Sequence, residues 1–274
     1  MTEDADASSL LGEIGLPERS SSTLPRSQTD LLADALDVPA PGPVLPALWH
    51  WAFFPPRAAT ASLGEDGHPA RPADGSLARL PRRMWAGGRL WFPGDLQIDA
   101  PTERRSQVVS VQHKQGTQGP CALVVLRHEL RQNTTLCVIE EQDLAYRPSA
   151  GSGAGPQPGP PASRSIVRPI SSVLLFRYAA LTFNAHRIHY DLAYATEVED
   201  YPGIVVQGPL IATLLAGLAT ADGGALAQFG YRATAPAFAP TELGLSVAGT
   251  AGELALVATR PDGVVAMSAT ATMR

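Results

Sequence analysis

Hydrophobic and polar residues alternate along the middle of the chain in the pattern of β-strands. Successive side chains of a strand point to opposite faces, so a strand with one buried face shows a period of two. Four such runs are joined by Gly, Pro and Asn turns, which predicts an antiparallel meander. The predicted strands are residues 90–98, 104–115, 121–130 and 135–147.

A helical pattern opens the C-terminal part of the chain, and alternation then returns. Five Leu and Ile residues between 210 and 218 are spaced to form one apolar stripe on a helix. Gly208 and Pro209 stand before them, and proline at the first helical position loses no needed hydrogen-bond donor. Further strands are predicted at residues 231–239, 243–250, 253–260 and 264–273.

The order of these elements predicts an α+β protein built twice on one plan, a sheet wrapped on a central helix. Thr29 and Asp30 offer caps to a short helix over residues 31–38. The polar N-terminus is expected to be a flexible tail, or an arm that orders only against another surface. The predicted parts are a tail at 1–28, an N-terminal half at 29–146, a Pro/Gly/Ser-rich linker at 147–165 and a C-terminal half at 166–274.

An aromatic run between prolines, residues 39–56, interrupts the N-terminal half. It is interpreted either as a short buried helix or as the aromatic wall of a ligand pocket. Residues 57–78, which follow it, are expected to form a loop.

Composition narrows the classes of partner. The 274 residues carry a formal net charge of −5, and no basic face is evident, so nucleic acid is not expected as a partner. No stretch of about 20 apolar residues is present to span a bilayer, and the first ten residues are acidic where a secretory signal would be basic. A soluble, cytoplasmic protein is expected. Cys121 and Cys137 lie out of register on neighbouring predicted strands, which argues against a disulfide.

The polar segment 180–191, ALTFNAHRIHYD, holds two of the six histidines in an otherwise apolar region. His186 and His189 could bind a metal, but no third ligand lies at a recognisable spacing, so no metal is expected. They could also be structural histidines hydrogen-bonded in a core. Arg177 and Arg187 flank the segment and could bind a substrate carboxylate or a CoA phosphate, or be solvated surface residues. Arg82 and Arg83 could likewise bind phosphates.

Residues 176–210 resemble the hydratase motif of the MaoC-like, type 2 enoyl-CoA hydratases, which are hot-dog proteins. Residues 80–92, LPRRMWAGGRLWF, are similar to the N-terminal half of one subgroup. That subgroup contains mesaconyl-C4-CoA and itaconyl-CoA hydratases and mitochondrial-type 3-hydroxyacyl-thioester dehydratases. The resemblance covers most of residues 30–274 and implies a double hot-dog fold, with the hydration site in the C-terminal half and a degenerate N-terminal half that accommodates the acyl or CoA arm.

The resemblance also implies roles for the motif. The family pattern of Asp, Asn and His falls on Asn184, His186 and His189, and an amide cannot act as a base. His189 is therefore the first candidate for the base and His186 the second, with Asn184 holding the water or the imidazole. Gly208 is expected to donate its N–H to an enolate oxygen from the start of its helix.

Two further residues follow from the same alignment. Tyr190 and Gln207 are expected near the substrate, and Tyr190 with Asp191 could orient His189. Asp191 could instead cap the next helix.

The reaction implied is reversible hydration of a 2-enoyl-CoA thioester, with a short branched dicarboxylic substrate such as mesaconyl-C4-CoA or itaconyl-CoA giving citramalyl-CoA. Alternatives are a 3-hydroxyacyl-thioester dehydratase of fatty-acid or polyketide type, a hot-dog thioesterase and a non-catalytic acyl-thioester binding protein. Coenzyme A enters only as part of the substrate, and no other cofactor is expected. Homodimerisation is left open.

Overall fold

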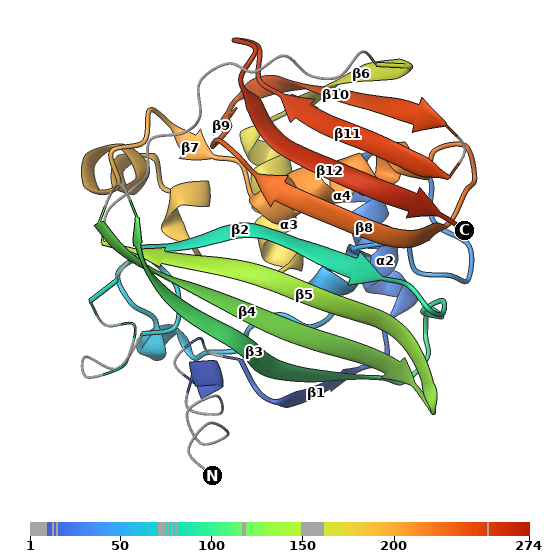
Figure 1. Cartoon of the computed structure of the whole chain (residues 1–274), viewed down its shortest axis with the longest axis horizontal. Helices are drawn as coiled ribbons and strands as arrows, with labels where there is room; N and C mark the ends of the chain where they lie inside the picture. Colours follow the sequence, from blue (N-terminus) through green and yellow to red (C-terminus); the bar gives the residue numbers. More distant parts are fainter. Residues whose placement is uncertain are drawn as a thin grey trace.

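One antiparallel sheet of ten strands runs through the computed structural model of the chain (Figure 1). The structure describes residues 10–12, 14, 16–70, 75, 77, 79–80, 82–116, 119–148, 162–250 and 252–274. The strand order is β1-β3-β4-β5-β2-β8-β12-β11-β10-β6. The strands are β1 (Arg19–Ser22), β2 (Arg82–Trp91), β3 (Thr102–Gly116), β4 (Gly119–Gln132), β5 (Thr135–Arg147), β6 (Arg164–Ile170), β8 (Leu226–Ala233), β10 (Thr241–Thr250), β11 (Glu253–Thr259) and β12 (Val265–Met273).

The two halves of the chain meet at the centre of this sheet. β2 pairs with β8, with Leu90 opposite Phe229, and both side chains belong to one hydrophobic core that includes residues of both halves. The N-terminal strands lie on one side of this junction and the C-terminal strands on the other (Figure 1). This is the predicted double hot-dog architecture, with its two sheets joined edge to edge.

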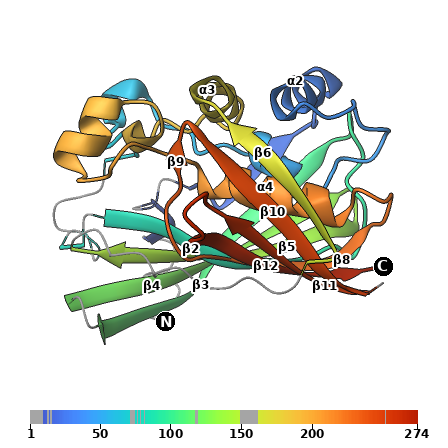
Figure 2. The ribbon, with the colours of Figure 1, turned by 90° about the horizontal axis from the view of Figure 1, so that it is seen from above.

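The C-terminal sheet wraps a central helix, as predicted. Helix α4 (Gly208–Ala219) packs against β8, β10, β11 and β12. Viewed from above, it lies between the sheet and two outer helices, α2 (Arg26–Leu36) and α3 (Ser172–Leu181) (Figure 2). Leu210 and Leu215 of α4 are completely buried, so the apolar stripe faces the core.

The N-terminal half differs from this plan. The aromatic run forms a 3-10 helix over Trp49–Ala52, and Trp49 and Phe53 join the core. Trp51 and Phe54 line a pocket, together with Leu126 of β4. Both interpretations of the aromatic run therefore hold, since it is a short buried helix and also a pocket wall.

Several expected boundaries need correction. The strand expected at 90–98 ends at Trp91, because Pro93 has no N–H to donate to a ladder. The strand expected at 231–239 breaks near Pro236, and its end pairs as β9 (Phe238–Ala239) with β7 (Ile204–Val205). Helix α2 begins at Arg26 after Pro25, so Thr29 and Asp30 lie inside it and do not cap it.

The flexible tail predicted at 1–28 is wrong for the part that the structure describes. Strand β1 pairs with β3, and Leu10, Leu11 and Ile14 are buried against β4 and β5. This agrees with the alternative of an arm that orders against another surface. Residues 1–9 and most of the linker predicted at 147–165 lie outside the described residues.

Two expectations from composition have counterparts in the structure. Cys121 and Cys137 are free thiols, so no disulfide joins them. Cys137 is buried, whereas Cys121 is only partly buried. No helix in the described ranges is both long and apolar enough to cross a membrane.

Candidate active site

The polar motif lies in a tight turn after α3, a helix that the sequence analysis missed. Phe183 adopts a left-handed conformation with φ of 51°, and the N–H of Asn184 donates to the carbonyl of Ala179 at 2.8 Å. The Asn184 Oδ1 then accepts the N–H of His186 at 3.0 Å. A 3-10 helix, Arg187–His189, follows. These bonds fix the backbone that presents the two histidines.

His189 is held as a neutral imidazole with one defined tautomer. Its Nδ1 lies 2.7 Å from the carbonyl oxygen of Val205 in β7, and a carbonyl can only accept, so Nδ1 carries the proton and Nε2 the lone pair. Burial lowers the pKa of His189 to about 4, more than this hydrogen bond raises it. The ring is therefore uncharged at neutral pH and able to accept a proton.

His186 lies between His189 and a third histidine, His68. The ring centroids of His186 and His68 are 4.2 Å apart, and those of His186 and His189 are 5.3 Å apart. Burial, followed by the charges of His68 and His189, lowers the pKa of His186 to about 2. The three imidazoles thus form one row.

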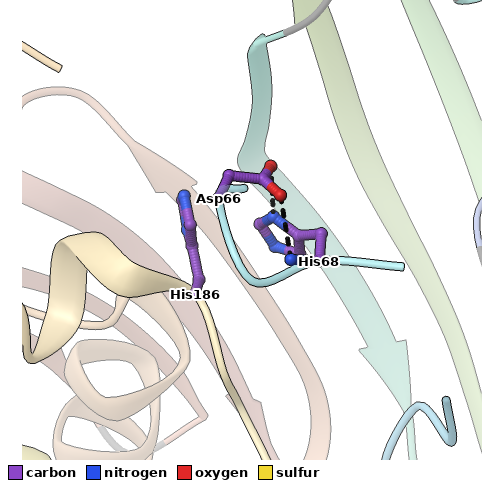
Figure 3. A group of neighbouring side chains, drawn as sticks. All are labelled: Asp66, His68 and His186. Carbon is purple, nitrogen blue, oxygen red and sulfur yellow. Dashed lines mark hydrogen bonds and ion pairs between the residues drawn. The ribbon is translucent and has the colours of Figure 1, made fainter. Parts of the chain in front are cut away.

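His68 and Asp66 come from the N-terminal half and were missed by the sequence analysis (Figure 3). The loop that holds them turns between paired Leu63 and Pro69. Gly67, with φ of 85°, packs so closely that a Cβ there would lie 1.9 Å from the carbonyl oxygen of Ala185. The sequence signal for these two residues was the segment GEDGHP, in which a carboxylate and a histidine flank a glycine. The segment lies far from the motif in sequence, so it was not connected with the site.

The side chains of Asp66 and His68 form a hydrogen-bonded pair. His68 Nδ1 lies 3.0 Å from Asp66 Oδ2, and the His68 N–H donates to Asp66 Oδ1 at 2.9 Å (Figure 3). Burial by itself would raise the pKa of Asp66, but the hydrogen bonds and charge of His68 hold it well below its usual range. Asp66, His68 and His186 each offer a ligand atom within 4.8 Å of the others, so together they could also hold a metal ion.

A pocket of about 610 Å³ adjoins the motif and is lined by both halves of the chain. Asn184, Tyr190 and Pro209 line it from the C-terminal half, and His68 and Arg104 from the N-terminal half. His186 and His189 are not among its lining residues and lie behind His68. Asn184 and His68 therefore reach the pocket, and the other two histidines do not.

The start of α4 forms part of the same wall. A Cβ on Gly208 would lie 2.8 Å from the Trp85 ring, so the backbone and this indole approach closely. Gln207, expected near the substrate, is fully buried and donates from Nε2 to the Leu175 carbonyl at 3.0 Å. It does not line the pocket. The expectation for Gln207 is therefore corrected: its amide joins α3 to the beginning of α4.

Arg177 and Arg187 are both occupied within the protein. Arg187 donates from Nε and Nη2 to Asp191 Oδ2, at 3.0 and 2.7 Å, and from Nη1 to the Glu65 carbonyl. Arg177 is exposed on α3 and donates to the carbonyl of Asp34 in α2. Neither lines the pocket, which corrects the expectation that they bind substrate.

Of the remaining residues expected at the site, some line the pocket and others are paired elsewhere in the protein. Arg82 pairs with Glu199, whereas Arg83 lines the pocket, as neighbours on a strand point to opposite faces. Tyr190 lines the pocket and donates its hydroxyl to the Ala185 carbonyl at 3.2 Å. Asp191 Oδ1 accepts the N–H of Tyr194 at 3.1 Å, so it caps the following helix, the alternative considered from the sequence.

Similar proteins were found by sequence. A sequence profile of the hydroxyacyl-thioester dehydratase type 2 family matches residues 48–239. Over 266 residues the chain is 39% identical to mesaconyl-C(4)-CoA hydratase of Chloroflexus aurantiacus, covering 94% of this chain and 95% of that protein. The mitochondrial hydroxyacyl-thioester dehydratase type 2 of Schizosaccharomyces pombe is 28% identical over 196 residues, covering 60% and 63%.

Solved structures share the fold at low sequence identity. HtdX of Mycobacterium tuberculosis matches with a TM-score of 0.69 at 15% identity, covering 93% of this chain and all (100%) of that chain. A MaoC-like dehydratase from Phytophthora capsici matches with a TM-score of 0.72 at 10% identity, covering 96% and 98%. At such identities the likeness extends to the fold alone.

Proposed function

Because the chain belongs to the hydroxyacyl-thioester dehydratase type 2 family of MaoC-like hot-dog proteins, we propose that it is a hydro-lyase that reversibly adds water to a 2-enoyl-CoA thioester. The observation that carries the proposal is His189, a buried neutral imidazole with its Nδ1 committed to a backbone carbonyl. Such a ring is prepared to accept a proton from water on Nε2.

In the proposed reaction His189 removes a proton from water, and the hydroxide adds to the β-carbon of the thioester. Asn184 holds the water. Its Oδ1 already accepts the N–H of His186, so Nδ2 remains to donate. Water and substrate reach His189 past Asn184 and His68, which line the pocket where His189 does not.

Addition of hydroxide moves negative charge onto the thioester oxygen. The first N–H groups of a helix have no partner within the helix and carry the positive end of its dipole. Gly208 begins the 12-residue helix α4, and Pro209, next to it, lines the pocket. We assign the Gly208 N–H to this developing oxyanion.

The enolate must then take a proton on its α-carbon. His68 lines the pocket, and Asp66 accepts its Nδ1–H, so an ionised carboxylate stabilises positive charge on this ring. We assign His68 as the proton donor and Asp66 as the residue that positions it. His189 gains one proton in each cycle and His68 loses one, and exchange with water restores both.

We propose a short branched dicarboxylic substrate, mesaconyl-C4-CoA or itaconyl-CoA, hydrated to citramalyl-CoA. The similarity to a mesaconyl-C(4)-CoA hydratase over nearly the whole chain supports this choice. Dehydration of a 3-hydroxyacyl thioester of fatty-acid or polyketide type is the second candidate, because the family profile and the yeast relative carry that name.

The division of the chain at residues 146 and 165 remains a proposal, with the N-terminal half accommodating the acyl or CoA arm, whereas the boundary expected at residue 28 falls inside α2. Arg83 is the retained candidate for a CoA phosphate, because it lines the pocket. We also propose a cytoplasmic location and a homodimer, which cell fractionation and light scattering test.

Loss of enoyl-thioester absorbance tests the proposed function on mesaconyl-C4-CoA, itaconyl-CoA and crotonyl-CoA. Wild-type protein is expected to hydrate the dicarboxylic thioesters, and His189→Ala is expected to lower kcat by about a hundredfold to ten-thousandfold, the range for general base catalysis. The exposed His113→Gln serves as a control with unchanged rate. Full activity in His189→Ala would refute the assignment, and no activity with any thioester would favour an acyl-thioester binding protein.

A further inference from the structure

The part of the pocket wall that the N-terminal half supplies contains a buried arginine that the proposed reaction does not use. Arg104 lies in β3, lines the pocket and is 7% exposed. Its Nη1 donates to the carbonyl of Phe54 at 2.8 Å, and its guanidinium lies 5.2 Å from the centroid of the Phe54 ring. These contacts hold the side chain in one orientation.

Two of the remaining donor atoms of Arg104 have no partner. Nε and Nη2 are buried, and neither makes a hydrogen bond with the described part of the chain. Burial lowers the pKa of Arg104 to about 10, although the charge of Glu140 raises it, so the guanidinium remains a cation at neutral pH. Buried charged donors without acceptors are strongly unfavourable.

The nearby acidic residue does not supply the missing acceptor. Glu140 also lines the pocket, but its Oε2 lies 3.0 Å from His50 Nε2, and its Oε1 accepts Trp51 Nε1 and Gln142 Nε2, both at 2.7 Å. Its carboxylate is thus satisfied by three other side chains. No ion pair joins Arg104 to an acid among the residues that the structure describes.

The other neighbour, His128, does not accept a hydrogen bond from Arg104 either. The missing acceptor must therefore come from outside the protein. Burial lowers the pKa of His128 to about 4, so the ring is neutral at neutral pH, and its Nδ1 is bonded to Ser106 Oγ at 2.8 Å. Arg104 is therefore a cation at the pocket wall with two buried, unused donors, beside aromatic walls formed by Trp51 and Phe54. A planar anion fits this arrangement, because a guanidinium binds a carboxylate through two parallel hydrogen bonds.

We propose that Arg104 binds the free carboxylate at the far end of the substrate's acyl chain and so selects dicarboxylic over monocarboxylic acyl-CoA thioesters. The inference rests on the proposed function, because it needs an acyl thioester whose reacting end lies near Asn184 in the same pocket. Arg104 is a specificity residue here and takes no part in the proton transfers.

The choice of carboxylate follows from where Arg104 sits. A CoA phosphate is bulky and highly charged and belongs at an exposed opening, whereas Arg104 is more than nine-tenths buried. A carboxylate on a short acyl chain can reach such a position without bringing further charge into the core.

Kinetic comparison of two substrates tests the proposal. In Arg104→Met, kcat/KM for mesaconyl-C4-CoA is expected to fall by about a hundredfold or more, because a site built to hydrogen-bond its substrate depends strongly on that contact. The value for crotonyl-CoA, which has no free carboxylate, is expected to stay within about threefold. Arg105→Gln is the matched control, because Arg105 is exposed on the same strand and pairs with Glu18. Equal losses on both substrates, or no loss on either, would overturn the proposal.

A second measurement uses only the wild-type protein, in case Arg104→Met does not fold. By titration calorimetry, succinyl-CoA is expected to bind at least about tenfold more tightly than butyryl-CoA, which lacks the second carboxylate. Equal Kd values would refute the role of Arg104. If the wild-type protein hydrates neither enoyl-CoA, the proposed function fails, and the ratio of the two Kd values still decides the role of Arg104.

Discussion

Two histidines in the site have opposite electrostatic surroundings. His189 donates Nδ1–H to a neutral carbonyl and is buried, whereas His68 donates to an ionised carboxylate. We propose that these two rings divide the base and acid roles between them. The resemblance implies an aspartate at the position of Asn184, which is an amide, but a carboxylate, Asp66, lies near the histidines from the other half of the chain.

Stability should depend on pH through two buried histidines, His128 and His189, and one partly buried histidine, His186. Burial lowers the pKa values of His128, His186 and His189 to about 4, 2 and 4, whereas each would titrate near 6.5 in the unfolded chain. As the pH falls below about 6.5 the unfolded state binds more protons, so the free energy of unfolding decreases. We expect full stability above pH 7 and a loss of up to about 2 kcal/mol for each histidine at pH 5.

Urea denaturation at pH 7 and pH 5 measures this effect. His128→Gln should reduce the difference between the two midpoints, and the exposed His113→Gln should not. Equal midpoints at the two pH values in the wild-type protein would show that these rings are not held neutral.

The residue types of the site were partly predictable from the sequence. The segment around His189 stands out because many polar residues occur in an otherwise apolar region. Gly208 also stands out, because it directly precedes the apolar stripe of a predicted helix. Nearness in sequence to the motif was a poor guide to the arginines, because Arg177 and Arg187 are hydrogen-bonded within the protein, whereas Arg83 lines the pocket. Arg187 is bonded to Asp191, whereas Arg104, far away in the sequence, lines the pocket and has two buried donor atoms without a partner in the described part of the chain.

Among the elements, helix α4 links the fold to the proposed chemistry. Its buried stripe anchors it against the C-terminal strands, which fixes the position of its first N–H group. The close approach of Trp85 at Gly208 leaves no room for a side chain. Gly208 therefore serves packing against Trp85, and we propose that its N–H also binds the oxyanion.

Gly208→Ala should lower kcat by about tenfold to a thousandfold, because the added Cβ would contact the Trp85 ring and displace the N–H that stabilises the oxyanion. Gly217→Ala in the same helix is the control. A Cβ there meets nothing within 4 Å, so activity should be unchanged and stability should rise by about 0.5–1 kcal/mol. Wild-type kcat in Gly208→Ala would contradict the role of this N–H.

The loop from Leu63 to Pro69 is the element that completes the site. We expect His68→Ala to lower kcat by about a hundredfold, because it removes the proposed proton donor. Asp66→Asn should lower kcat by a smaller factor and change the pH profile, because it acts through His68. The exposed Glu65→Gln should have the wild-type rate.

Steady-state kinetics with and without a chelator separates this role from metal binding, which the cluster of Asp66, His68 and His186 would also permit. Loss of wild-type activity on chelation would replace the proton-donor assignment with a metal site.

Regular elements were the more predictable part of the fold. Alternation identified β3, β4, β5, β10, β11 and β12, because each has one buried face, whereas β6 was not predicted. Helix α3 was missed, since it lies directly before the motif and its apolar residues are not confined to one face. The loop that carries His68 has no periodicity, and only tertiary packing brings it to the motif.

At the scale of the whole molecule, the two halves form one sheet and share one pocket. The C-terminal half fills the concave side of its strands with α4, whereas the N-terminal half leaves space there for polar residues such as Arg104 and Glu140. We propose that the two halves of the double hot dog divide two tasks. The C-terminal half carries the histidine motif, and the N-terminal half forms the proposed acyl-binding end.

The most direct test of the central claim is mass spectrometry of the product formed from mesaconyl-C4-CoA in water enriched in oxygen-18. A hydratase is expected to give an intact CoA thioester that carries one oxygen-18 atom in a new hydroxyl group, and His189→Ala should form it far more slowly. Release of free CoA with oxygen-18 in a carboxylate would identify a thioesterase and contradict the account.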